Sequence, residues 1–206
     1  MQPPALPYSG EIARKALHLL AMLMPAGMLF VPRPEALVIL WTLAILAMAT
    51  DLWRQHNPTL GSWIDRRLGF MMRASERGLH PDRRFNGATW VMITAALLLT
   101  VFPAKFAAPG MVIAMIADAG AALVGRKIGR HPWPGTSRTV EGSAGFLLTG
   151  VLAALLFPGI PWSHRLAAIG VAAVVEIPPI RVNDNLLLPF AASTVLWWLA
   201  GAPPIW

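Results

Sequence analysis

Residues 111–124 read MVIAMIADAGAALV, an apolar run with a single carboxylate, Asp118. Gly125, Arg126 and Lys127 follow the run directly. A bilayer-spanning helix needs about 20 predominantly apolar residues, so this run and the residues before it predict such a helix, which ends near the basic pair. Asp118 would then lie about 12 Å below that end, at ~1.5 Å per residue. An ionisable group at such a depth is costly, which predicts a functional role; an ion pair with Arg14 or Lys15 is the structural alternative.

The composition of the chain is that of a membrane protein. Of its 206 residues, 56% are apolar and 13% are charged, whereas soluble domains carry about 25% charged residues. We predict one domain, residues 1–206, with an all-α fold: a polytopic transmembrane bundle of about seven helices. The apolar segments are approximately 12–31, 35–53, 87–102, 105–125, 142–160, 164–178 and 186–201.

The basic residues predict the orientation of this bundle. With the N-terminus in the cytosol, 14 of the 17 lysines and arginines fall on the cytosolic side, and Arg33, Lys105 and Arg165 fall outside. This positive-inside bias predicts an N-in, C-out topology. It also explains the net charge of +7, so we expect no nucleic-acid partner.

Two further features limit the interpretation. The connection of residues 54–86 mixes apolar and charged side chains, which predicts an amphipathic helix on the cytosolic membrane surface, with a plain basic loop as the alternative. The chain has no cysteine, which excludes disulfides, thiolate metal sites and cysteine nucleophiles.

Polar residues also cluster at one end of the first segment. Glu11, Arg14, Lys15 and His18 follow an i, i+3, i+4, i+7 spacing, which places them on one helix face. Basic side chains that extend from a helix end to the membrane surface are the alternative. His18 lies inside the apolar run and fits that alternative less well.

The stretch after the Asp118 helix has the composition of a phosphate site. Glycines and basic residues run from Gly125 to Arg130, and the sequence SRTVEGS follows at 137–143. Glycines permit tight turns, while backbone N–H groups and arginines bind phosphate oxygens. A helix that begins near Gly142 would direct its positive end toward this loop. The spacing is not that of a Walker A loop, and an ordinary basic loop is the alternative.

Oxygen ligands recur near the C-terminal end. Glu176 precedes two prolines, and Asn183, Asp184 and Asn185 follow. Carboxylates and an amide next to a phosphate site are ligands that Mg²⁺ prefers, with a polar proline turn as the alternative. All these groups fall on the cytosolic side of the predicted topology, which indicates one shared site.

The order of the motifs resembles the family of dolichol kinase, phytol kinase and CTP-dependent diacylglycerol kinase. The resemblance covers residues 11 to 190, and Ala117 and Arg138 stand where many members have glycine and lysine. The matched residues are Arg14, Lys15, His18, Asp51, Arg54, Pro58, Gly69, Phe70, Arg73, Glu76, Gly87, Ala88, Thr89, Asp118, Ala121, Gly125, Gly129, Arg138, Thr139, Glu141, Gly142, Ser143, Asp184, Asn185, Leu186 and Pro189.

The resemblance implies transfer of the γ-phosphate of CTP, with Mg²⁺ or another divalent cation, to the hydroxyl of a membrane lipid. The lipid would be a polyprenol- or phytol-type alcohol or diacylglycerol. We expect an integral protein of the bacterial inner membrane with its active site facing the cytosol.

The implied roles divide the matched residues and their neighbours into three groups. The catalytic residues would be Asp118, Glu141, Asp184 and His18. The nucleotide and phosphate ligands would be Arg14, Lys15, Asn86, Thr89, Gly125, Arg126, Lys127, Gly129, Arg138, Thr139, Gly142 and Ser143. The metal ligands would be Asp118, Glu141, Glu176, Asp184 and Asn185. Asp51, Arg54, Arg73 and Glu76 match the family without a defined role.

Two other functions remain open. A phosphatidate cytidylyltransferase also uses CTP and has a similar Lys-Thr-x-Glu-Gly stretch, but the basic, aspartate-rich C-terminal signature of that family is missing here. A small transporter could use Asp118 and Glu176 as ion sites, but such proteins often contain paired broken helices in two halves, and we find no internal repeat. The identity of the lipid and the oligomeric state cannot be read from this sequence.

Overall fold

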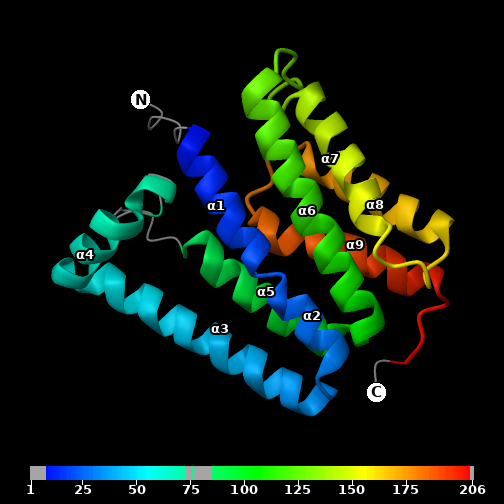
Figure 1. Cartoon of the computed structure of the whole chain (residues 1–206), viewed down its shortest axis with the longest axis horizontal. Coiled ribbons are helices and arrows are strands. Elements are labelled where there is room, and N and C mark those ends of the chain that lie inside the picture. The colour runs from blue at the N-terminus through cyan, green and yellow to red at the C-terminus, as the bar shows by residue number, and fades with distance from the viewer. Residues whose placement is uncertain (1–7, 73–75, 77–84, 205–206) are drawn as a thin grey trace.

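The computed structural model describes residues 8–72, 76 and 85–204, and this part of the chain is helical without a β-strand (Figure 1). The elements in chain order are α1 (Tyr8–Leu20), α2 (Leu23–Phe30), α3 (Arg33–His56), α4 (Pro58–Leu68), the 3₁₀ turn η1 (Gly69–Met71), α5 (Gly87–Val101), α6 (Ala104–Ile128), α7 (Val140–Ala154), α8 (Trp162–Glu176) and α9 (Asp184–Leu199). The prediction of an all-α helical bundle is confirmed.

Each predicted apolar segment corresponds to helical structure. The first comprises α1 and α2, which a break at Ala21 and Met22 separates. In the part of the chain that the structure describes, three helical stretches are long and apolar enough to cross a membrane: Tyr8–Phe30, Arg33–His56 and Ala104–Ile128. The segment predicted to run to residue 160 ends as a helix at Ala154, and a connection with Pro158 and Pro161 follows.

The amphipathic helix predicted between residues 54 and 86 is present as α4. Its N-terminus is capped by the Asn57 side chain, which accepts hydrogen bonds from the N–H groups of Thr59 and Leu60 at 3.0 and 3.1 Å. Pro58 occupies the first helical position, where its missing N–H costs nothing. The exposed Trp63 carries the Arg67 guanidinium 5.9 Å from its ring centroid.

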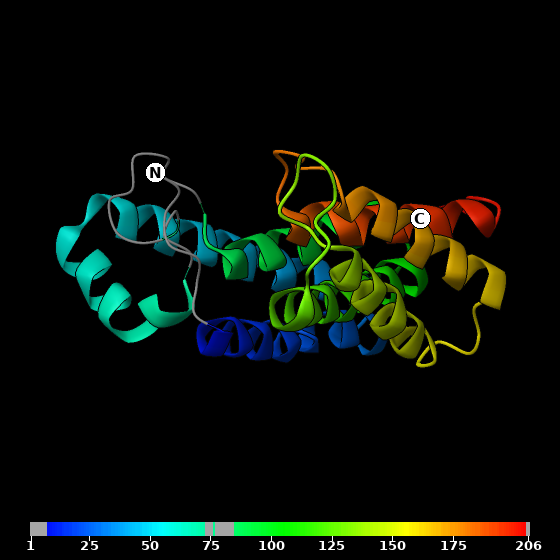
Figure 2. The same ribbon diagram turned by 90° about the horizontal axis from the view of Figure 1, so that it is seen from above.

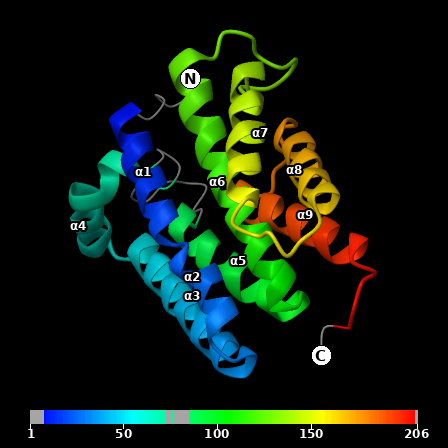
Figure 3. The same ribbon diagram turned by 45° about the vertical axis from the view of Figure 1, so that its right-hand side comes forward.

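Helix α6 forms the centre of the molecule. In the most apolar 18-residue stretch of α6, 72% of the residues are buried. The corresponding shares are 17% for Tyr8–Phe30 and 22% for Arg33–His56. Figures 1 and 3 show α6 and α7 side by side. A Cβ atom added at Gly120 would lie 2.1 Å from the Thr149 Oγ1 atom, so glycine is what allows these two helices to approach so closely.

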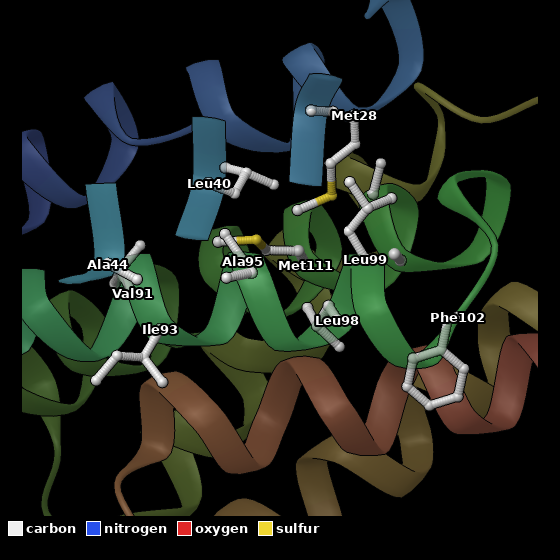
Figure 4. Close-up of a cluster of buried hydrophobic side chains, with 14 of the residues drawn as sticks. Met28, Leu40, Ala44, Val91, Ile93, Ala95, Leu98, Leu99, Phe102 and Met111 are labelled. Atoms are coloured by element: carbon white, nitrogen blue, oxygen red, sulfur yellow. The ribbon is translucent and has the colours of Figure 1, made fainter. Parts of the chain in front are cut away.

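A hydrophobic cluster joins α5 to α2, α3 and α6. Its buried members include Met28, Leu40, Leu98, Leu99 and Met111, and Figure 4 shows them facing one another. The outward faces carry many exposed apolar side chains, such as Val38 on α3 and Leu148 on α7. Large exposed apolar surfaces of this kind fit contact with lipid or a partner.

The three basic residues predicted to lie outside occur at the beginnings of helices. Arg33 donates a 2.7 Å hydrogen bond to the Leu99 carbonyl near the end of α5. Arg165 does the same for the Ala154 carbonyl at the end of α7, at 2.7 Å, and its guanidinium lies 4.0 Å from the Trp162 ring centroid. These arginines satisfy the free carbonyl groups of helix C-termini and connect neighbouring helices.

Candidate functional site

A cavity of about 1730 Å³ opens where the N-terminal end of α1, the C-terminal end of α6, the loop of residues 129–139 and the α8–α9 connection meet. Figure 2 shows this loop beside the α8–α9 connection. The charged residues in its lining are Glu11, Arg14, Glu76, Asp118, Arg126, Arg138, Glu176, Arg181 and Asp184. The structure thus brings the segments predicted to be cytosolic together at one site.

Asp118 lies in the wall of this cavity with Lys15 behind it. The Lys15 ammonium donates a hydrogen bond to the Asp118 carboxylate, and both side chains are buried. Lys15 is not among the described residues that line the cavity, so it pairs with Asp118 instead of facing a ligand. His18 lies one turn further along α1 and is also outside the described lining.

Glu11 is buried between two arginines from different helices. Its Oε1 atom accepts a 2.6 Å hydrogen bond from Arg14, and its Oε2 atom lies 3.2 Å from an Arg126 nitrogen. The carboxylate therefore joins α1 to α6 at the cavity wall. The i, i+3 spacing of Glu11 and Arg14 places both on the polar face of the first helix, but this pattern assigns no role to Glu11.

Arg138 bridges two carboxylates on the opposite wall. Its Nη1 atom lies 2.8 Å from Glu176 Oε1, and its Nη2 atom donates to Asp184. Burial lowers the pKa of Arg138, but Asp184 and Glu176 outweigh burial and raise this pKa above its ordinary value. The guanidinium is therefore a permanent cation within the site.

Asn183 and Asn185 position the start of α9. Asn183 caps the helix through a 3.0 Å hydrogen bond from the Asn185 N–H. The Asn185 side chain donates to the Gly87 carbonyl at 3.1 Å, which ties α9 to α5. Asn185, expected to be a metal ligand, is thus placed in a contact between helices.

Glu141 lies apart from the described cavity lining. Its carboxylate accepts hydrogen bonds from the backbone N–H groups of Arg130 and His131, at 3.1 and 3.2 Å, and contacts the His131 ring at 2.6 Å. The hydrogen bond from His131 is the main reason that the pKa of Glu141 falls to about 2. In this structure the residue closes the loop of residues 129–139, whereas the resemblance implied a catalytic or metal-binding role.

The other predicted phosphate ligands of this loop pack against one another. The Thr139 hydroxyl caps α7 by accepting a 3.1 Å hydrogen bond from the Gly142 N–H. A Cβ at Gly129 would lie 2.2 Å from the Gly125 carbonyl oxygen, so a side chain there would force the loop away from α6. Gly125, Thr139 and Gly142 also line the cavity, whereas Gly129 and Lys127 are not among its described lining residues.

A second polar network lies at the junction of α3 and α5. Asp51 accepts hydrogen bonds from Arg54 Nε at 2.9 Å, the Asn86 N–H at 2.7 Å and the Thr89 hydroxyl at 3.0 Å. Arg54 also donates to the Glu76 carbonyl at 2.6 Å, and the Asn86 side chain caps α5 through the Thr89 N–H. Asn86 and Thr89 thus stabilise the helix junction.

One family-matched residue of this region, Arg73, lies outside the described residues, as do Arg77, Arg83 and Arg84, which contributed to the predicted topology. Glu76 is described, and it is buried in the lining of the cavity.

Several aromatic residues in the lining were not identified as site residues from the sequence. Phe85 and Trp90 pack edge to face with ring centroids 6.2 Å apart, and Tyr8 also lines the cavity. The Trp133 indole donates to the Ser143 hydroxyl at 3.0 Å, so this predicted phosphate ligand has a protein partner. No local sequence pattern separates these aromatic residues from ordinary core positions.

Among the described residues, no group of three or more His, Cys, Asp or Glu side chains is placed to hold a metal ion. Asp118, Glu176 and Asp184 face the same cavity, each beside a basic group. A Mg²⁺ ion that arrives with a nucleotide needs only one or two protein carboxylates, because phosphates and water supply its other ligands. Glu176 and Asp184, which share Arg138, fit that requirement.

Two curated proteins resemble the chain in sequence. It is 28% identical over 196 residues to the uncharacterized protein RP860 of Rickettsia prowazekii (strain Madrid E), covering 91% of this chain and 94% of that protein. It is 26% identical over 151 residues to dolichol kinase of Saccharomyces cerevisiae (strain ATCC 204508 / S288c), covering 66% of this chain but 26% of the yeast protein. No family model and no solved structure matches. The chain is therefore a distant relative of part of a dolichol kinase.

Proposed function

We propose that this protein is a membrane lipid-alcohol kinase that transfers the γ-phosphoryl group of CTP to the hydroxyl of an isoprenoid alcohol or diacylglycerol. The observation that carries the proposal is the cavity at the end of α6, which combines Asp118 with the guanidinium groups of Arg14, Arg126 and Arg138. The distant similarity to yeast dolichol kinase supports the same class of reaction.

In the proposed reaction the chain positions two substrates and neutralises charge, which is most of what phosphoryl transfer requires. Arg14 and Arg126 would bind phosphate oxygens from one wall and Arg138 from the other. Asp118 would accept the proton of the lipid hydroxyl as its oxygen bonds to the γ-phosphorus. The bond between this phosphorus and the bridging oxygen breaks, and CDP leaves. Lys15 would hold the Asp118 carboxylate in place.

A divalent cation belongs to the proposal. Glu176 and Asp184 would hold it together with the nucleotide phosphates, and it would supply additional neutralisation of the phosphate charge. Arg138 already lies between these two carboxylates, so metal binding would require a change in their contacts.

We also propose that the cavity faces the cytosol of a bacterium from within its inner membrane, where the nucleotide is available. Two facts support this placement. The basic residues obey the positive-inside rule under this orientation, and Arg14, Arg126, Arg138 and Arg181 of the predicted cytosolic side line the cavity.

The deciding experiment offers the purified protein Mg²⁺ and γ-labelled CTP or ATP, each with a long-chain isoprenoid alcohol or diacylglycerol. Label in the lipid fraction from CTP is the expected result, and the preferred acceptor would identify the substrate. Label in the lipid from ATP alone would identify ATP, and not CTP, as the phosphoryl donor. In a parallel reaction with α-labelled CTP and phosphatidate, release of pyrophosphate with retention of the label in the lipid would instead indicate a cytidylyltransferase.

A further inference from the structure

We infer that Glu11 is a positioning residue that aims Arg14 and Arg126 at the phosphates of the nucleotide, so that the two arginines act as one clamp. The inference rests on the proposed function, because it concerns the nucleotide side of the same cavity. Glu11 is not among the residues that resemble the kinase family.

The contacts of Glu11 divide its carboxylate between two helices. One oxygen accepts the 2.6 Å hydrogen bond from Arg14 on α1, and the other lies 3.2 Å from Arg126 on α6. The Glu11 side chain is 1% exposed, whereas those of Arg14 and Arg126 are 18% and 34% exposed. The carboxylate is therefore almost enclosed, whereas the two arginine side chains are partly exposed where they line the cavity.

The charges of this cluster favour an anionic ligand. One carboxylate faces two guanidiniums, and a third guanidinium, that of Arg138, lines the same cavity. A guanidinium presents several N–H donors in a fixed plane, so Arg14, which binds Glu11 through one Nη atom, has other donors for phosphate oxygens. Arginine side chains that are already ordered lose less rotamer freedom when the ligand binds.

A positioning role and a purely electrostatic role predict opposite effects of Glu11→Gln. If Glu11 only neutralised charge, its removal would make the cavity more positive and would strengthen the binding of a polyanion. If Glu11 positions the arginines, its removal leaves them mobile and weakens binding. The sign of the change in KM for the nucleotide therefore separates the two roles.

The test measures kcat and the KM for CTP by lipid phosphorylation, in detergent at saturating lipid. For Glu11→Gln we expect KM to rise about tenfold with a smaller change in kcat, as for the loss of contacts made equally in the ground and transition states. Glu35→Gln is the matched control, because Glu35 is exposed at the start of α3, and its constants should equal those of the wild type.

A double-mutant cycle measures the coupling between two substitutions in their effects on KM, which general destabilisation would not change. Once Arg126→Gln has removed one arm of the clamp, Glu11→Gln should raise KM by less than it does alone, because the two residues act through one contact. Glu11→Asp, which keeps the charge, should give an intermediate KM. It replaces Glu11→Gln in the cycle if gel filtration shows that Glu11→Gln does not fold.

The outcomes separate this inference from the proposed function. An unchanged or lower KM in the Glu11 variants, with an active wild type, overturns the positioning role alone. Effects of Glu11 and Arg126 that multiply independently overturn it as well. A wild-type protein that labels no lipid with any donor overturns the proposed kinase function, and the clamp with it.

Discussion

At the scale of single residues, the ion pair between Lys15 and Asp118 defines the candidate site. The pair joins positions 103 residues apart and is buried between α1 and α6. A buried ion pair is not in itself a source of stability, since desolvation offsets much of its attraction. Asp118 of this pair lines the cavity, so we expect the pair to hold the carboxylate in place for the proposed reaction.

The first prediction concerns Asp118→Asn. The variant should lose lipid phosphorylation by at least ~100-fold, the usual contribution of a positioned acid or base. Near-normal turnover in the labelling assay would contradict the catalytic role. Because the substitution leaves the Lys15 charge unpaired, a loss of about 3–5 kcal/mol in stability is also expected.

A double variant separates the loss of activity from the loss of stability. Lys15→Met combined with Asp118→Leu removes both buried charges, and thermal unfolding in detergent should return toward that of the wild type, because apolar replacements of buried ion pairs are often neutral or better. The double variant should still phosphorylate no lipid.

At the scale of elements, close helix packing and polar junctions hold the site together. The glycines of α6 and α7 set the distance between these helices, and the Asp51 network anchors α5 to the end of α3. Asp51 and Thr89 are among the residues that resemble the kinase family. Neither they nor Gly120 are among the described residues that line the cavity.

We predict that Gly120→Ala destabilises the protein by about 1–3 kcal/mol, the usual cost of overpacking. The added Cβ would lie 2.1 Å from Thr149 Oγ1, so α7 would have to move away. Thermal unfolding in detergent measures the effect, and adding Thr149→Ala should restore part of the loss.

Gly170→Ala is the matched control for this helix packing. A Cβ at Gly170 meets no atom within 4 Å, so this change in α8 should raise stability by up to about 1 kcal/mol through helix propensity. Equal behaviour of the Gly120 and Gly170 variants would contradict the packing role of Gly120.

We also predict that Asp51→Ala lowers the free energy of unfolding by about 3–5 kcal/mol, because it leaves the buried Arg54 without its carboxylate. Asn86 and Thr89 lose an acceptor at the same time. Denaturation of the detergent-solubilised protein measures the change. Glu35→Ala, an exposed carboxylate on the same helix, should leave stability within about 0.5 kcal/mol of wild type.

At the scale of the whole molecule, the structure places the predicted cytosolic connections at one cavity, and their orientation can be measured directly. The chain has no cysteine, so single introduced thiols report without background. Under the N-in, C-out topology, Gly159→Cys between α7 and α8 should react with a membrane-impermeant maleimide in intact cells. Ser137→Cys, in the loop after α6, should react only after permeabilisation. The reverse pattern would contradict the orientation.

Much of the architecture followed from local sequence patterns. Apolar runs bounded by proline and glycine predicted the described α-helices other than α4, because a buried or lipid-facing helix must be apolar over its length. The amphipathic composition of residues 54–86 predicted a helix, and α4 is there. Asp118 was predicted to be functional because an ionisable group deep in an apolar run is costly, and the structure shows the ion pair with Lys15 that was named as the structural alternative.

The tertiary structure decided which of the polar residues meet. In the folded chain Lys15 binds Asp118, Glu11 lies between Arg14 and Arg126, and Glu141 binds His131 and the loop amides. Helix periodicity gives the face on which a residue lies, but not the neighbour across the interface. That neighbour depends on how closely the helices pack. Glycines such as Gly120 set this distance, because a side chain at Gly120 would collide with Thr149 of the neighbouring helix.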